Sequence, residues 1–202
     1  IGGVLRLRTS LNWSESLPRF GPRIAVTRTR QQAGGLVAQL RTLGADAYEL
    51  PTIRIEPAPD KKVFYEVVAD AHSYDWIIFT SPNGVEAFFT AFFEIYRDAR
   101  DIGNARIAAI GPATAERIRA RHLQVDLQPE KYVAEAIVED LKKVESVENL
   151  KFLLPRAEGA REILATELTR LGAIVDDIPA YRTVPESEDV SGGIKRFREE
   201  GA

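Results

Sequence analysis

One β-α-β pattern occurs twice in the chain, and this repeat limits the possible folds more than any other feature. The copies span residues 26–51 and 154–179 and align without a gap. Each contains an apolar strand, an arginine, an amphipathic helix, a Leu-Gly stop and a second strand that ends at proline. The matched pairs are Arg28 and Arg156, Leu36 and Leu164, Leu40 and Leu168, Leu43 and Leu171, Gly44 and Gly172, and Pro51 and Pro179. A single duplication at this distance predicts two related α/β units rather than a solenoid, although it indicates architecture and not chemistry.

The composition excludes several classes of protein. Hydrophobic residues make up 45% of the chain and charged residues 28%, as in globular proteins, and the net charge of −3 offers no basic field for nucleic acid. The absence of cysteine excludes disulfides and thiolate chemistry, and two isolated histidines cannot form a His-rich metal site. No apolar run approaches the roughly 20 residues of a membrane span, and no signal peptide is recognisable. We therefore expect a cytoplasmic protein without a nucleic-acid or membrane partner.

The sequence also contains no methionine, not even at position 1. Its last residues, IKRFREE, are typical of a helix that would continue into further structure. We therefore expect a fragment of a longer protein, open at both ends.

Strands and helices alternate through the chain, which predicts an α/β fold with doubly wound, mainly parallel sheets. The predicted strands are 23–27, 47–50, 76–80, 106–110, 125–127 and 152–154, and the predicted helices are 31–43, 63–71, 84–97, 113–121 and 134–143. Four phenylalanines, Phe88, Phe89, Phe92 and Phe93, share one predicted helix. We interpret them as core side chains rather than as a base-stacking platform.

Two extended, proline-bounded segments divide the chain into domains. Residues 52–56 and 181–185 alternate apolar and polar side chains and are predicted to pair as a two-stranded antiparallel hinge. The predicted domains are a linker at 1–22, an incomplete outer α/β domain at 23–51 plus 186–202, and an inserted complete α/β domain at 57–180. The linker is a candidate tail of a preceding domain.

Ligands of open parallel sheets bind beyond the carboxyl ends of the strands, so the loops at those ends contain the candidate binding residues. These loops are short, rich in hydroxyl groups, and open the next helix with proline or glycine, where free N–H groups favour anions. The candidates are Arg28, Ser81, Pro82, Asn83, Gly84, Gly111, Pro112, Ala113, Thr114 and Arg156. Ordinary helix capping explains Ser-Pro and Gly-Pro starts equally well for any single loop.

Several catalytic motifs are missing from the sequence. It contains no G-x-x-x-x-G-K-[ST] loop, no G-x-G-x-x-G after a strand, and no G-x-S-x-G with triad partners. If the protein is an enzyme, we expect it to act by binding and orienting its substrate rather than through a recognisable acid–base pair.

At these same loops the sequence resembles the uroporphyrinogen-III synthase family. The matching segments are VTRTR (26–30), PTIRIEP (51–57), YDWIIFTSPNGVEAFF (74–89), AAIGPATAERI (108–118), LLPRAEGAREIL (153–164), LGA (171–173) and IPAYRTV (178–184). The resemblance covers residues 23–185 and rests on the order and spacing of the segments. It implies two α/β domains joined by a two-stranded ladder, with the active site in the cleft between them.

The resemblance also implies a reaction. The family converts hydroxymethylbilane, a linear tetrapyrrole with many carboxylates, into uroporphyrinogen III, expelling the terminal hydroxyl as water and inverting the last pyrrole ring through a spiro-pyrrolenine. It uses no cofactor and no metal. By the same resemblance Tyr181 is the catalytic candidate that assists loss of the hydroxyl, and Ser81 and Thr114 contact substrate. A hinge-packing role is the alternative for Tyr181.

Residues 5–24 resemble the joint in fused proteins where this synthase follows a uroporphyrinogen-III C-methyltransferase, so a fusion in cis is expected, with the synthase part a monomer. The competing interpretation of the whole chain is a non-catalytic module, either a synthase-like sensor or a small-anion-binding protein with two domains.

Overall fold

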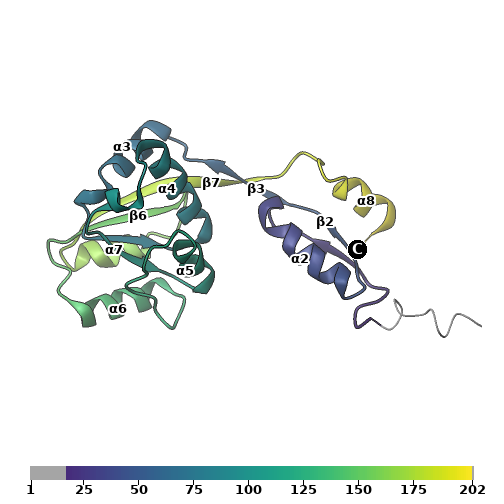
Figure 1. The fold of residues 1–202 in the computed structure, drawn as a ribbon, viewed down its shortest axis with the longest axis horizontal. Coiled ribbons are helices and arrows are strands. Elements are labelled where there is room, and N and C mark those ends of the chain that lie inside the picture. The colour runs from purple at the N-terminus through teal and green to yellow at the C-terminus, as the bar shows by residue number, and fades with distance from the viewer. Residues whose placement is uncertain (1–16, 202) are drawn as a thin grey trace, which may run out of the picture. The chain divides into compact units, whose positions relative to one another are not determined.

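The computed structural model describes residues 17–201, so most of the predicted linker at 1–22 lies outside the described residues. The chain divides into two compact units, with boundaries after residues 54 and 183. Unit 1 contains the described residues up to 54 and from 184 onward, and unit 2 contains residues 55–183. Two strands, β3 (Ile53–Pro57) and β7 (Ile174–Pro185), carry the chain out of one unit and into the other. β3 and β7 are hydrogen-bonded neighbours (Figure 1).

Unit 2 is built on parallel strands with helices on both faces. Its strands are β4 (Trp76–Phe79), β5 (Arg106–Ala109), β6 (Lys151–Ala157) and most of β7, and the sheet order is β3-β7-β6-β4-β5. The helices are α3 (Lys61–Ala69), α4 (Pro82–Ile95), α5 (Pro112–Arg119), α6 (Ala134–Val144) and α7 (Ile163–Arg170), and the 3₁₀ turns are Ala71–Ser73 and Ala99–Ile102. The pairs β4–β5, β4–β6 and β6–β7 are all parallel, which confirms the predicted α/β class with mainly parallel sheets.

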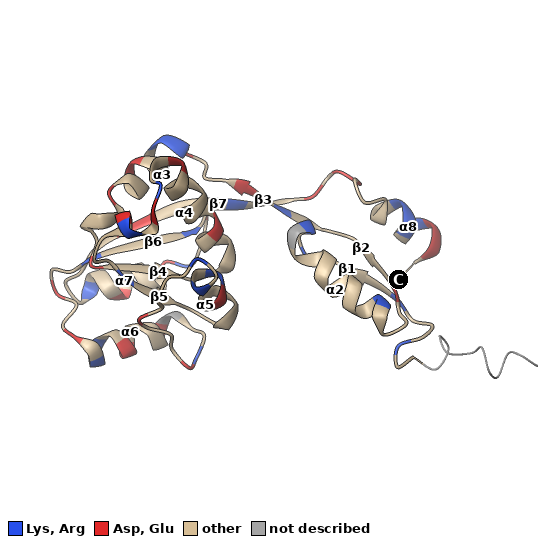
Figure 2. Ribbon diagram, in the orientation of Figure 1, with Lys and Arg blue, Asp and Glu red and all other residues tan. Residues whose placement is uncertain are grey.

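Alternate side chains of each strand enter opposite cores, because successive residues of a strand point to opposite faces. In β4, Ile77 and Phe79 pack with α3, α4 and α5, whereas Trp76 and Ile78 pack with α6 and α7. No residue of β4 is charged, and Figure 2 shows charges mainly on helices and loops. Phe93 corrects the prediction for the aromatic helix: it is 45% exposed, although Phe88 is fully buried.

Strand order reverses at β4, because β4 connects onward to β5 on one side while β6 and β7 follow on its other side. The carboxyl ends of β4 and β6 therefore form the topological switch point of the sheet, where open α/β sheets bind ligands. Two predicted elements differ from the structure. The predicted strand 125–127 is reduced to a single bridge between Ala108 and Leu127, and the predicted hinge strand 181–185 is the end of the continuous β7.

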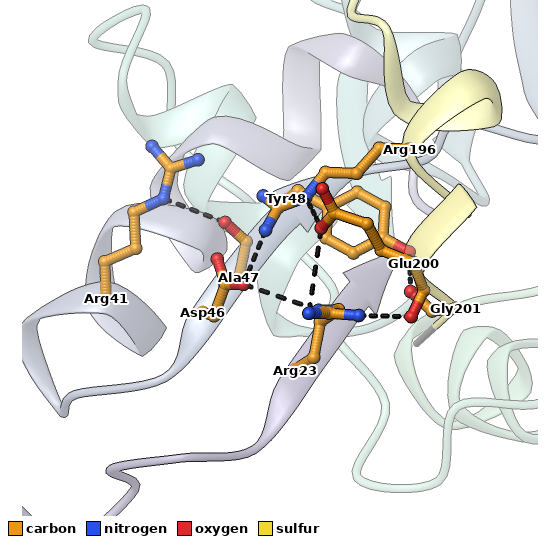
Figure 3. Close-up of polar contacts among 8 residues, drawn as sticks. All are labelled: Arg23, Arg41, Asp46, Ala47, Tyr48, Arg196, Glu200 and Gly201. Atoms are coloured by element: carbon orange, nitrogen blue, oxygen red, sulfur yellow. Dashed lines mark hydrogen bonds and ion pairs between the residues drawn. The ribbon is translucent and has the colours of Figure 1, made fainter. Parts of the chain in front are cut away.

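Unit 1 contains the two-stranded parallel sheet of β1 (Arg23–Val26) and β2 (Asp46–Glu49), with α2 (Arg30–Thr42) between them in sequence. Val26, Ala33, Val37 and Ala47 form its small apolar core. The helix α8 (Gly193–Glu200) is joined to the sheet by polar contacts drawn in Figure 3. The Tyr48 hydroxyl donates to the Gly201 carbonyl over 2.8 Å, and the Arg196 guanidinium lies 4.7 Å from the Tyr48 ring centroid.

Candidate active site at the carboxyl edge of unit 2

Ser81 begins helix α4 directly beyond the carboxyl end of β4. Its Oγ accepts a hydrogen bond from the Gly84 N–H over 3.0 Å, and Pro82 occupies the first helical turn, where a missing N–H costs nothing. Gly111 takes the same place before α5 with a φ of +85°, followed by Pro112. Both helices therefore direct their positive ends and free N–H groups to the carboxyl edge of the sheet, an arrangement that favours an anionic ligand.

The first turn of α4 touches β6 backbone to backbone. A Cβ placed on Gly84 would lie 2.6 Å from the Pro155 carbonyl oxygen, closer than real carbon and oxygen atoms approach. Glycine is therefore required here for the helix to pack this tightly against the strand. The contact holds Ser81 and its hydroxyl at a fixed position next to the switch point.

Tyr181 reaches this position because β7 contains a bulge. The parallel register pairs Arg156 with Pro179 and then Ala157 with Tyr181, which leaves Ala180 as the extra residue of β7. Bulges redirect the side chains that follow them. Ala180 and Tyr181 consequently pack in the same core cluster, and the Tyr181 hydroxyl lies 3.0 Å from the Ser81 Oγ.

The structure therefore brings together Tyr181, Ser81, Pro82, Asn83 and Gly84 at one edge of unit 2. Tyr181 is 7% exposed. Because an unpaired buried hydroxyl costs free energy, the hydrogen bond between the two side chains stabilises this arrangement. Asn83 is half-buried in the first turn of α4.

In the loop that begins α5, the two candidate residues after Pro112 differ in their exposure to solvent. Ala113 is exposed and follows Pro112 in the first turn, whereas Thr114 is only 2% exposed. In this structure Thr114 is part of the packing beneath α5 and does not present its hydroxyl at the surface.

Arg156 also differs from the expectation of a free anion-binding arginine. It is 4% exposed, and its Nε donates to an Asp177 carboxylate oxygen over 2.8 Å, while a second nitrogen bonds the other oxygen. Its remaining terminal nitrogen donates to the Arg161 carbonyl oxygen over 2.6 Å. This two-pronged pair satisfies the buried guanidinium within unit 2, although the Asp177 side chain itself is 31% exposed.

Arg28 lies in unit 1, in the exposed loop between β1 and α2. Its neighbour Arg30 contacts Glu186 with an N···O distance of 3.1 Å, and Arg54 contacts the same carboxylate over 3.6 Å. One carboxylate thus pairs with two arginines near the β1 loop.

Two residues near the site were missed in the sequence. Tyr132 is 60% exposed, and its ring reaches to 4.0 Å from the place of a Cβ on Gly111. Only the exposed position of an aromatic before α6 could have indicated it. Asp177 was also missed, although an aspartate pair inside a predicted apolar strand was a usable signal.

No group of three or more His, Cys, Asp and Glu side chains within residues 17–201 could hold a metal ion. No helix in the same range is long and apolar enough to cross a membrane. The groups described at this edge of unit 2 are hydroxyls, helix N-terminal N–H groups and the tyrosines Tyr181 and Tyr132.

A family model described as uroporphyrinogen-III synthase HemD matches residues 35–202. The chain belongs to this family. Among relatives of the synthase family, a porphyrin biosynthesis protein HemD from Ruminiclostridium josui is 32% identical over 187 residues, which cover 91% of this chain and 36% of that protein. A uroporphyrinogen-III synthase from Synechococcus elongatus is 34% identical over 167 residues, covering 82% of this chain and 62% of that protein.

The chain thus spans between about a third and two thirds of the length of these two synthase-family relatives. A solved structure of a mutant uroporphyrinogen III synthase from the extremely thermophilic bacterium Thermus thermophilus matches with a TM-score of 0.61 at 16% identity, covering 90% of this chain and 70% of that chain. At this identity the match shows a shared synthase fold.

Proposed function

We propose that this protein acts as a uroporphyrinogen-III synthase, the hydro-lyase that closes hydroxymethylbilane into uroporphyrinogen III with inversion of the last pyrrole ring. Family membership supports the activity. The observation that carries the proposal at the level of residues is the placement of the Tyr181 hydroxyl, 3.0 Å from Ser81 at the topological switch point of unit 2. A tyrosine at that place can donate a hydrogen bond to the terminal hydroxyl of the substrate as it leaves as water.

Substrate binding is assigned to groups that favour carboxylates. The N-terminal turns of α4 and α5 supply the positive ends of two helix dipoles, with backbone N–H donors at Asn83, Gly111 and Ala113, while Pro82, Gly84 and Pro112 shape the two turns. Arg28 offers an exposed guanidinium in unit 1. Since these groups bind a flexible chain of pyrroles without acid–base chemistry of their own, we propose that they act mainly by fixing its shape before ring closure.

The proposed role of Tyr181 explains why a single hydroxyl suffices. Loss of water from the substrate needs only partial neutralisation of the departing oxygen, because the pyrrole nitrogen supplies the electrons. A hydrogen bond from a buried, oriented phenol is stronger than one from water that must reorganise. Ring inversion and closure then follow in the bound conformation.

The test uses the full-length protein encoded by the natural gene and hydroxymethylbilane generated enzymatically in the same vessel. The products are oxidised and separated by chromatography into isomers I and III. Isomer III is expected as the main product with wild-type protein, and Tyr181→Phe is expected to lower kcat at least tenfold while it reduces the free energy of unfolding by only about 1 kcal/mol. Isomer I alone, as in buffer, would contradict the proposal and leave the non-catalytic module as the better interpretation.

A further inference from the structure

We infer that Ser81 is a positioning residue that orients the Tyr181 hydroxyl, rather than a residue that binds substrate itself; the inference rests on the proposed function. Two hydrogen-bond partners occupy the Ser81 Oγ in the structure. The Gly84 N–H donates to it over 3.0 Å, and the Tyr181 Oη lies 3.0 Å away. Ser81 is half-buried, and both hydrogen-bond partners of its hydroxyl belong to unit 2.

The hydrogen bond between Ser81 and Tyr181 can run in either direction, and only one direction serves the reaction. A serine hydroxyl has one proton to donate and can accept two hydrogen bonds, and Gly84 already uses one acceptor position. If Ser81 donates its proton to the Tyr181 oxygen, the phenol proton stays free for the departing hydroxyl of the substrate. In the reverse direction, the phenol proton is held by Ser81 and cannot serve the reaction.

With Ser81 as the donor, a short chain of hydrogen bonds runs from the Gly84 N–H through Ser81 to Tyr181. It begins at the N-terminus of α4, where the helix dipole is positive. Hydrogen bonds in such a chain polarise one another, so each donor strengthens the next. Ser81 thereby transmits the field of the helix end to the phenol proton.

Two features of the backbone hold this chain in place from opposite sides. On β7, the bulge after Pro179 turns Tyr181 into the core cluster that α4 also lines. On α4, the missing side chain of Gly84 allows the helix start to contact the Pro155 carbonyl oxygen of β6. Neither feature is needed for ordinary capping of α4, which the Ser81 hydroxyl achieves alone.

A residue that positions Tyr181 and one that contacts substrate give different kinetics. If Ser81 positions Tyr181, Ser81→Ala lowers kcat and leaves KM almost unchanged, because the lost interaction acts in the transition state. Its effect also disappears once Tyr181 has no hydroxyl to orient. If Ser81 contacts substrate carboxylates directly, Ser81→Ala raises KM, and its effect multiplies with that of Tyr181→Phe.

The experiment compares five forms of the full-length protein: wild type, Ser81→Ala, Ser81→Thr, Tyr181→Phe and the double variant Ser81→Ala with Tyr181→Phe. The rate of isomer III formation is measured against substrate concentration. We expect Ser81→Ala to lower kcat about tenfold, Ser81→Thr to remain within about threefold of wild type, and the double variant to equal Tyr181→Phe. Threonine retains the hydroxyl, so it restores both the cap and the hydrogen bond.

Loss of the helix cap is controlled separately with Asp60→Ala. Asp60 caps α3 in the same unit by accepting from the Val63 N–H over 3.1 Å. This variant is expected to lose a similar amount of stability and to keep the wild-type kcat. Any of three results would overturn the inference. They are an equal fall in kcat for Asp60→Ala, a rise in KM alone for Ser81→Ala, and a fall in kcat of the double variant equal to the product of the two single effects. Wild-type protein that makes only isomer I would instead overturn the proposed function, and the positioning role with it.

Discussion

In the first copy of the repeat, β1 pairs with β2 from Arg23 opposite Asp46, and in the second, β6 pairs with β7 from Lys151 opposite Ile174. These positions correspond within the sequence repeat, so both copies start their parallel pairs at the same place. Both helices also end before a glycine with positive φ, +96° at Gly44 and +87° at Gly172. The two copies share their strand register and their helix stop.

The copies differ between the first strand and the helix. β1 has four residues and α2 has thirteen, whereas β6 has seven and α7 has eight. The longer β6 includes Arg156 within a strand between β4 and β7, where it is buried against Asp177. Arg28, its counterpart, stays in an exposed loop. A matched arginine thus indicates a shared position, while the neighbouring strands decide whether its charge is paired internally.

The largest predicted effect concerns the pair of Arg156 and Asp177 in the second copy. Asp177→Ala leaves the buried Arg156 guanidinium without its carboxylate and is expected to destabilise unit 2 by about 2 kcal/mol. Glu49 is the matched position of the first copy, and Glu49→Ala is the control, with an expected change of about 0.5 kcal/mol. Urea unfolding followed by far-UV circular dichroism, which reports on the helices of both units, measures the two changes. If both variants lost the same small amount of unfolding free energy, the pair of Arg156 and Asp177 would not distinguish the two copies.

The next effect tests the shared helix stop. Alanine at Gly44 or Gly172 must adopt a left-handed backbone, which costs about 1–2 kcal/mol in each copy. Gly44→Ala is expected to cost more, because its Cβ would lie 2.7 Å from the Leu17 Cβ, whereas the nearest atom at Gly172 is the Cγ of Glu148 at 3.0 Å, on a flexible side chain. Thermal unfolding of both variants provides the measurement. A stabilising substitution at either site would contradict the common geometry.

A third prediction separates the two arginines by their effect on binding. If Arg28 holds a substrate carboxylate, Arg28→Ala raises KM about fivefold, as expected for loss of about 1 kcal/mol, and leaves the unfolding midpoint unchanged. Arg156→Ala is expected to behave in the opposite way, lowering the unfolding midpoint while the remaining folded protein keeps its KM. An Arg28 variant with wild-type kinetics would remove Arg28 from the proposed site.

The smallest effect is a dependence of unit 1 on pH. The Glu188 backbone N–H donates to the Glu186 carboxylate, and Arg30 and Arg54 lie beside it, so the pKa of Glu186 is lowered. A lowered pKa in the folded state stabilises at pH values above the ordinary glutamate pKa, and this stabilisation is lost as the pH falls through the lowered value. Glu186→Gln is expected to weaken this loss of stability at acidic pH, which is measured as the rate of amide hydrogen exchange in β1 and α2. Glu188→Gln serves as the control and should lose stability at acidic pH as the wild-type protein does.

Local patterns in the sequence predicted many of the strands and helix starts. The run Trp76–Phe79 is apolar on both faces and forms a strand buried on both faces, and Ser-Pro and Gly-Pro predicted the helix starts at Ser81 and Gly111. The contact between Ser81 and Tyr181 could not be predicted, because it depends on a bulge that shifts β7 by one residue. Periodicity specifies which residues share a face, but it does not specify where a strand gains an extra residue.

The burial of Arg156 was equally hidden from the sequence. Its position after an apolar strand matches that of Arg28, and only the pairing of β6 with β7 brings Asp177 within reach. The prediction that Phe93 belongs to the core was wrong, because the core does not cover the side of α4 on which Phe93 lies. In each case a neighbour distant in sequence decided the outcome.

The contact between Gly84 and the Pro155 carbonyl has a consequence for mutational scanning. In a saturation library selected for folded protein, codons for every other amino acid at Gly84 should be depleted, because even one methyl group collides with backbone that cannot move aside. Such depletion is usually taken as a sign of a chemical role. At this position it would report a steric fit, since the Gly84 N–H that contacts Ser81 is backbone and is present in every replacement except proline.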